Sequence, residues 1–125
     1  MSGGTLGGEQ PVVDVVVAVH SEHRPIERAV ASALTGRVPV RVTVVCHEVD
    51  PSLVEARLHH VSRTSAAGPH SMWLVCFSDG VRSPAGPFKH GLDCAQAPFV
   101  ALLGSDDEFA PGAITDWHIH PNGQY

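Results

Sequence analysis

The sequence predicts an α/β protein with a Rossmann-like, mostly parallel four-stranded sheet and helices on both of its faces. Short apolar, β-branched runs alternate with segments whose apolar residues recur at helical spacing. A proline also stands near the start of each helical segment, where its missing N–H group costs no hydrogen bond; these are Pro25, Pro51, Pro87 and Pro111. Strands that alternate with helices are typical of parallel sheets with right-handed crossovers.

The first half of the chain supplies two strand–helix units. Residues 12–19 are almost all valine and alanine, and such a continuous run predicts a strand buried on both faces. Residues 24–36 carry one apolar helical face and end at a glycine. A second β-branched run at 41–46 predicts the next strand. The helix after it begins at Asp50, a favoured capping residue, and has an apolar stripe that reaches Val61.

The second half repeats the pattern. A polar stretch with a Gly-Pro pair at 62–71 predicts a surface loop. The third strand is predicted at 72–77, the third helix at 86–95 and the fourth strand at 99–103. A short last helix is predicted at 110–117.

Length and composition limit the classes of protein. The 125 residues have room for one domain, which we place at 11–117 between a flexible glycine-rich segment at 1–10 and a tail at 118–125. A net charge of −5 disfavours binding to nucleic acid. No run approaches the roughly 20 apolar residues of a transmembrane segment, and no signal peptide is recognisable. With three cysteines, an odd number, the chain is expected to be cytoplasmic.

Polar residues gather after the predicted strands, at the sheet edge where open α/β sheets bind ligands. His20 and Glu22 follow the first strand, and His47 and Glu48 follow the second. The third strand is followed by the polar segment 78–80. The position of these side chains, rather than their number, indicates a binding edge.

The sharpest polar feature is the acidic run Asp106-Asp107-Glu108 after the fourth strand. Adjacent carboxylates there suit a hard cation such as Mg²⁺ or Mn²⁺ that carries substrate phosphates. The alternative is a polar loop that caps the next helix, which is the commoner role of such a pair. Lys89 likewise has two interpretations: it contacts a phosphate, or it is a solvated residue near a helix end.

Other common sites are disfavoured. The chain has no Gly-x-Gly-x-x-Gly, no P-loop lysine and no Gly-x-Ser-x-Gly. Nine histidines are present, including His118 and His120, but a structural zinc site usually includes a Cys-x-x-Cys element, which is missing. Phosphate charge would therefore be met by a metal ion, helix N-termini, Arg24 or Lys89.

The order of these segments resembles the N-terminal, nucleotide-binding half of a family 2 glycosyltransferase with the GT-A fold. The resemblance rests on four segments, in the family's order: 15–25, 42–48, 87–95, and 97–107 with 110–112 after it. They match the first strand and nucleotide loop, the second strand, the Ala-Arg-Asn-x-Gly helix, and the strand that leads into the Asp-x-Asp motif with the Pro-Gly after it. Each motif alone is weak, whereas the ordered set is fairly specific.

The resemblance implies a role for each candidate residue. Asp106 matches the last position of the metal motif and Asp107 follows it, while Gly104 replaces the first aspartate. The nucleotide contacts implied directly or by neighbouring position are His20, Glu22, His47, Glu48, Lys89 and Asp106. Lys89 stands where the family has asparagine, and Cys46-His47 where it has an aspartate near the base or ribose.

The implied function is binding of a nucleotide-diphosphate sugar, a UDP- or GDP-sugar, through Mg²⁺ or Mn²⁺, for transfer of the sugar to an acceptor hydroxyl. The family's acceptor site and catalytic base follow this half, so we expect a truncated protein that is inactive alone, with a homo-oligomer or a partner chain covering the missing half. The alternative is a non-catalytic α/β interaction or remnant domain that needs a partner chain.

Overall fold

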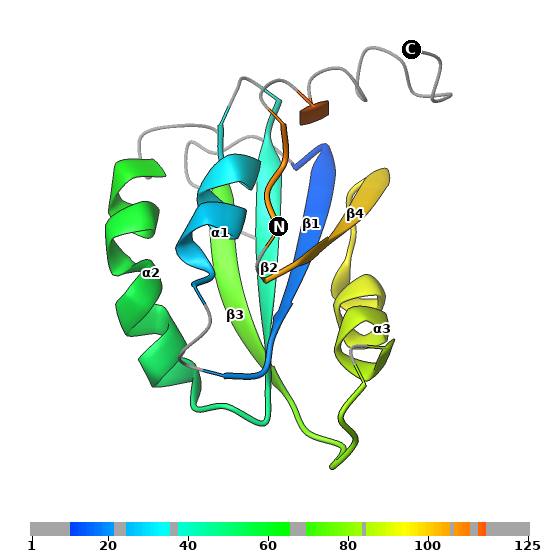
Figure 1. Ribbon diagram of the computed structural model, residues 1–125. Helices are drawn as coiled ribbons and strands as arrows, with labels where there is room; N and C mark the ends of the chain where they lie inside the picture. The colour runs from blue at the N-terminus through cyan, green and yellow to red at the C-terminus, as the bar shows by residue number, and fades with distance from the viewer. Residues whose placement is uncertain are drawn as a thin grey trace, which may run out of the picture.

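The computed structural model describes residues 11–21, 25–35, 38–65, 70–83, 85–105, 107–110 and 113–114, with the backbone alone at 62–65. Within them, strands and helices alternate along the chain (Figure 1). The elements are β1 (Val13–Val19), α1 (Glu27–Ala33), β2 (Val40–His47), α2 (Pro51–Ser65), β3 (Ser71–Phe77), α3 (Ala85–Cys94) and β4 (Phe99–Gly104). No helix among these residues is long and apolar enough to cross a membrane.

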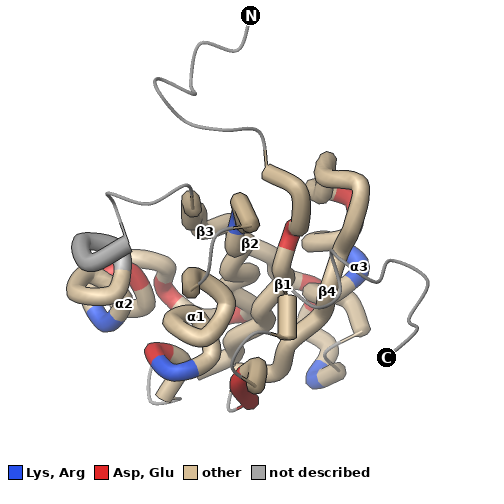
Figure 2. Tube along the Cα trace, turned by 90° about the horizontal axis from the view of Figure 1, so that it is seen from above, with Lys and Arg blue, Asp and Glu red and all other residues tan. Residues whose placement is uncertain are grey.

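The four strands form one parallel sheet in the order β3-β2-β1-β4. The chain steps outward from β1 to β3 and then returns to the other side of β1. Helices α1 and α2 therefore lie together on one face of the sheet and α3 lies on the opposite face (Figure 2). This architecture confirms the predicted fold class, and it places the point where the strand order reverses between β1 and β4.

The helix boundaries differ from the predicted ones in three places. Helix α1 begins at Glu27, with Ile26 as its N-cap, so Pro25 precedes the helix instead of opening it. Helix α2 continues to Ser65, into the stretch predicted as a loop, because residues 62–65 contain neither glycine nor proline. Helix α3 begins at Ala85, so Pro87 lies in its first turn. Of the predicted last helix, positions 113 and 114 are helical and 111–112 and 115–117 lie outside the described residues.

The hydrophobic core lies between the sheet and the helices α1 and α2. Alternate residues of β1 and β2 point into it and are almost completely buried; they are Val13, Val15, Val17, Val19, Val40, Val42, Val44 and Cys46. Val30 of α1 and Leu58 of α2 pack against them with no exposed surface. The predicted apolar faces of both helices are thus buried, except for Leu53 of the predicted α2 stripe, which is 44% exposed.

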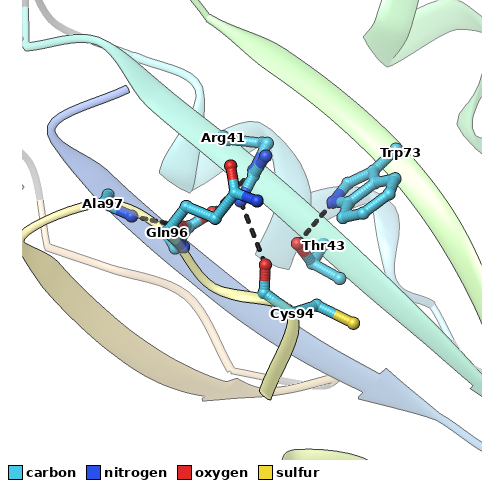
Figure 3. A network of polar contacts seen from close by, with 7 residues as sticks. Arg41, Thr43, Trp73, Cys94, Gln96 and Ala97 are labelled. Atoms are coloured by element: carbon cyan, nitrogen blue, oxygen red, sulfur yellow. Dashed lines mark hydrogen bonds and ion pairs between the residues drawn. The ribbon is translucent and has the colours of Figure 1, made fainter. Parts of the chain in front are cut away.

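The opposite face of the sheet contains a buried acid. Asp14 of β1 is fully buried, and its carboxylate accepts hydrogen bonds from Arg41 Nε (2.7 Å) and from the backbone N–H groups of Gln96 and Ala97 (2.8 Å each). Arg41 also donates to the carbonyl oxygen of Cys94 at 3.3 Å (Figure 3). These contacts tie the connection between α3 and β4 to the two central strands.

The same network continues to the edge strand β3. The Arg41 guanidinium lies over the ring of Trp73, 5.1 Å from its centroid, a distance typical of cation–π contacts. The indole N–H of Trp73 donates to Thr43 Oγ1 at 2.6 Å (Figure 3). One polar layer therefore spans β1, β2 and β3 beneath α3.

Close packing of α3 requires a glycine. A Cβ atom on Gly91 would overlap Cγ1 of Val16. We therefore expect Gly91→Ala to lower the free energy of unfolding by about 1–3 kcal/mol, the usual effect of overpacking, against roughly 1 kcal/mol that alanine gains in a helix. Urea denaturation measures the change. In a Val16→Ala background, which vacates this space, the penalty is expected to shrink; equal penalties in both backgrounds would contradict the packing explanation.

Candidate functional site

A cavity of about 800 Å³ lies at the carboxyl ends of the strands. Residues from the ends of β1, β2 and β4, from the loop after β3 and from α3 line it; they are Ala18, Val19, His20, His47, Glu48, Gly80, Val81, Arg82, Ser83, Pro87, Phe88, Gly104 and Ser105. This edge includes the reversal of strand order, which is where ligands bind in open α/β sheets. The cavity is large enough for a ligand of nucleotide size.

His47 is the last residue of β2 and forms the inner wall of the cavity. The residue is 5% exposed, and its Nε2 atom lies 2.8 Å from Oδ1 of Asp79 in the loop after β3. Its ring also packs against Phe77, its register partner on β3, with centroids 5.6 Å apart. The sequence cannot place Asp79 beside His47 unless the register of the two strands is known.

Glu48 links the loop after β3 to the end of β2 through hydrogen bonds. Its backbone is left-handed, with φ of 60°, which is uncommon for a residue other than glycine. The backbone N–H of Glu48 donates to the carbonyl oxygen of Phe77 at 3.2 Å. Its carboxylate oxygen Oε2 accepts the N–H groups of Asp79 (3.0 Å) and Gly80 (2.7 Å). Glu48 thereby fixes the start of the loop that carries Val81, Arg82 and Ser83 along the cavity.

Helix α3 packs closely against this loop at a second glycine, Gly86. A Cβ atom on Gly86 would lie 2.7 Å from Oδ2 of Asp79 and 2.9 Å from Cε2 of Phe77. Both distances are shorter than ordinary contacts, so glycine lets α3 approach the carboxylate. Asp79 Oδ1 also accepts the N–H of Val81 at 3.0 Å. Asp79 is therefore held in place by the N–H of Val81 in its own loop and by the His47 ring of β2.

Both carboxyl groups are held in their ionised form. Hydrogen bonds, above all from the N–H of Gly80, lower the pKa of Glu48. The N–H of Val81 and then the His47 ring lower the pKa of Asp79. Each carboxylate accepts protein donors, which favours its charged form.

These lowered pKa values predict an acid-sensitive loop. A carboxyl group with a lowered pKa in the folded state contributes stability above its unfolded pKa, near 4 for Asp and Glu, and loses it as the pH falls through the folded value. We expect amide exchange at Asp79 and Gly80 to accelerate below about pH 4, relative to residues of β1. Hydrogen exchange followed by mass spectrometry tests this; equal protection of loop and strand across that range would contradict it.

Among the described residues, His47, Glu48 and Asp79 form a group that could hold a metal ion, with one ligand atom of each within 4.8 Å of the others. The sequence had indicated Asp106 and Asp107 instead. Asp106 lies outside the described residues. Asp107 is exposed, and its backbone N–H donates to the carbonyl of Gly104, a residue that lines the cavity. The site at Asp106 and Asp107 thus stays a prediction.

The other predicted site residues are distributed as follows. His20, His47 and Glu48 line the cavity together, whereas Glu22 lies outside the described residues. Lys89 does not line the cavity: its Nζ atom lies 3.1 Å from Asp93 Oδ2 in an exposed pair on α3. Its predicted contact with a nucleotide remains a prediction.

Asp79 and the cavity residues Arg82 and Ser83 had no predicted role in the site. Asp79 lies in the polar segment 78–80 after the third strand, and that position is the available signal. Arg82 and Ser83 lie beyond that segment, in a stretch where neither periodicity nor a motif distinguishes them. The loop that is hydrogen-bonded to Glu48 brings both residues to the cavity.

Comparison with solved structures supports the fold. The chain resembles the crystal structure of S. aureus TarS 1–349 (TM-score 0.60, 19% identity) and the same protein in complex with UDP-GlcNAc (TM-score 0.64, 18% identity). A further TarS structure matches with a TM-score of 0.63 at 18% identity. Each match covers 88% of this chain but 32%, 31% and 19% of the respective TarS chains. No family model and no curated protein matches the sequence.

At this level of identity the comparison establishes a shared architecture. The chain shares with TarS a parallel α/β sheet of the Rossmann-like type. It spans about a third of the length of TarS 1–349.

Proposed function

We propose that this chain is the nucleotide-binding part of a family 2-like glycosyltransferase and that it binds a nucleotide-diphosphate sugar, with a UDP-sugar as the first candidate. The observation that carries the proposal is the large cavity at the carboxyl edge of a sheet whose fold is shared with TarS, a protein crystallised with UDP-GlcNAc. The residues predicted from the sequence to meet the nucleotide and those lining the cavity overlap at His20, His47 and Glu48.

The cavity offers complementary chemistry for such a ligand. The ring nitrogens of His20 and His47 and the carboxylate of Glu48 can pair with polar groups of a base or ribose. Arg82 and the hydroxyls of Ser83 and Ser105 are donors suited to phosphate oxygens. The ligand brings its own negative charge into a chain of net charge −5, so a cation is needed to offset it.

We propose Mg²⁺ or Mn²⁺ as that cation, held by the carboxylates of Asp106 and Asp107. Oxygen ligands of this kind fit hard divalent ions, and both residues come soon after Gly104 and Ser105, which line the cavity. When bound, the ion would neutralise the diphosphate. The neighbouring group His47, Glu48 and Asp79 is a second candidate position for the ion.

The proposed reaction is transfer of the sugar to an acceptor hydroxyl, which requires a base to take the hydroxyl proton. We assign no residue of these 125 to that role, and we expect the chain on its own to bind without transfer. A cytoplasmic location completes the proposal, because the three cysteines are free thiols, as in reducing compartments.

Isothermal titration calorimetry tests the proposal. UDP-GlcNAc and a GDP-sugar are titrated with and without Mn²⁺ into the wild type, Asp106→Ala and Asp79→Asn, with Asp93→Ala as an exposed control. We expect metal-dependent heat from the wild type that Asp106→Ala abolishes. Loss in Asp79→Asn alone would place the ion at the end of β2, and absence of heat from the wild type with every nucleotide would reject the function.

The second candidate is a non-catalytic module whose edge strand is covered by a partner chain. The observation that favours it is β4, which within the described part of the chain pairs only with β1. Its residues Phe99, Val100 and Leu102 are 38%, 41% and 48% exposed, although β4 carries no charge that would protect such an edge. Sedimentation analysis of the wild type and Leu102→Lys distinguishes the cases: self-association that the lysine abolishes supports this candidate.

A further inference from the structure

Two cysteines lie opposite each other at the ends of β2 and β3. Cys46 and Cys76 are register partners of the parallel pair, so their side chains project from the same face of the sheet. Neighbouring strands are about 4.8 Å apart, and disulfides join Cα atoms separated by roughly 4.4–6.8 Å. The two positions therefore satisfy the Cα separation that a disulfide needs without movement of the backbone.

The two thiols differ in accessibility. Cys46 belongs to the core and is 1% exposed, whereas Cys76 on the edge strand is exposed. A small cavity of about 290 Å³ is lined by both, together with Glu48, Val49, Phe77 and Ser78. A small reagent can thus reach the thiol of Cys76, while the thiol of Cys46 lies buried beside it.

The environment also sets the order in which the thiols react. Attack on a disulfide needs contact between the two sulfur atoms, and the 1% exposure of Cys46 keeps its sulfur away from a reagent in solution. The exposed Cys76 is the thiol that meets a reagent first.

We propose that Cys46 and Cys76 form a dithiol that a small-molecule disulfide, such as oxidised glutathione, converts into a cross-strand disulfide. The thiolate of Cys76 attacks one sulfur of the reagent, forms a mixed disulfide and releases one small thiol. Cys46 then loses its proton and attacks Sγ of Cys76, releasing the second small thiol. The protein gives up two hydrogen atoms and the reagent is reduced to two thiols, so atoms and electrons balance.

The bond would form next to the candidate site. Cys46 directly precedes His47, and Cys76 directly precedes Phe77. The carbonyl oxygen of Phe77 accepts a hydrogen bond from the backbone N–H of Glu48. Formation of the disulfide is independent of the proposed nucleotide binding, and its test needs no nucleotide.

The test uses the folded full chain in glutathione buffers of graded oxidised-to-reduced ratio, followed by acid quench, alkylation, intact mass and peptide mapping. Cys94→Ser is the matched control, because Cys94 lies on α3, on the opposite face of the sheet. We expect the wild type and Cys94→Ser to lose two hydrogen atoms in a reversible step, with the Cys46–Cys76 peptide recovered. Cys76→Ser is expected to form no bridge, and Cys46→Ala to keep glutathione on Cys76.

Three outcomes would overturn the proposal. One is a glutathione adduct on Cys76 that persists in the wild type while Cys46 stays reduced at every ratio. Another is a bridge that includes Cys94. The third is a Cys46–Cys76 bridge that forms only when denaturant is present, because the folded strands would then not present the thiols to each other.

Discussion

Replacing Asp14 by alanine is expected to lower the free energy of unfolding by about 3–5 kcal/mol, the usual cost of removing one partner of a buried ion pair. The variant leaves the mostly buried Arg41 without its carboxylate, since the Arg41 side chain is only 18% exposed. It also leaves the backbone N–H groups of Gln96 and Ala97 without their acceptor. Unsatisfied buried donors add to the cost of the uncompensated charge.

Asp93→Ala is the matched control for this prediction. Asp93 also pairs with a basic side chain, Lys89, but both side chains are exposed, at 64% and 76%. An exposed pair of this kind contributes at most about 1 kcal/mol. Urea denaturation of the two variants measures the difference. Similar small losses in both would mean that the Asp14 contacts contribute no more than a surface pair.

The strands and the core were predictable from the sequence because their signals are local. A run such as Val15-Val16-Val17, continuous and β-branched, favours a strand that is buried on both faces of a sheet. The start of α1 was less predictable. Pro25 suits the first turn of a helix, and Ile26, which has no capping side chain, nevertheless occupies the N-cap.

The partners within the site were not predictable, because they depend on strand register. His47 and Asp79 are 32 positions apart and meet because His47 pairs with Phe77 across β2 and β3. The same register brings Cys46 opposite Cys76. A shift of one position would turn these side chains to opposite faces of the sheet. The sequence indicates which loops lie close together, whereas the register of the strands determines which side-chain atoms contact one another.

The second large effect is expected at Glu48, through the shape of the cavity at the carboxyl ends of the strands. Glu48→Ala removes the acceptor of the Asp79 and Gly80 N–H groups, so the loop that presents Arg82 and Ser83 loses its attachment to β2. Ligand binding must then order this loop, and the affinity for a UDP-sugar is expected to fall about tenfold or more, as loss of charge-assisted hydrogen bonds implies. Glu48→Gln keeps one acceptor oxygen and is expected to lie between the wild type and the alanine variant.

Two measurements on the same variants separate the role of Glu48 in the loop from general destabilisation. Calorimetry gives the Kd, and hydrogen exchange of Asp79 and Gly80 shows whether the loop has loosened. Glu55→Ala is the control, since it removes the same charge from an exposed position on α2. Because exchange needs no ligand, faster exchange in Glu48→Ala alone supports the attachment even if no nucleotide binds. Unchanged exchange together with an unchanged Kd would show that the two hydrogen bonds of Glu48 do not hold the loop in solution.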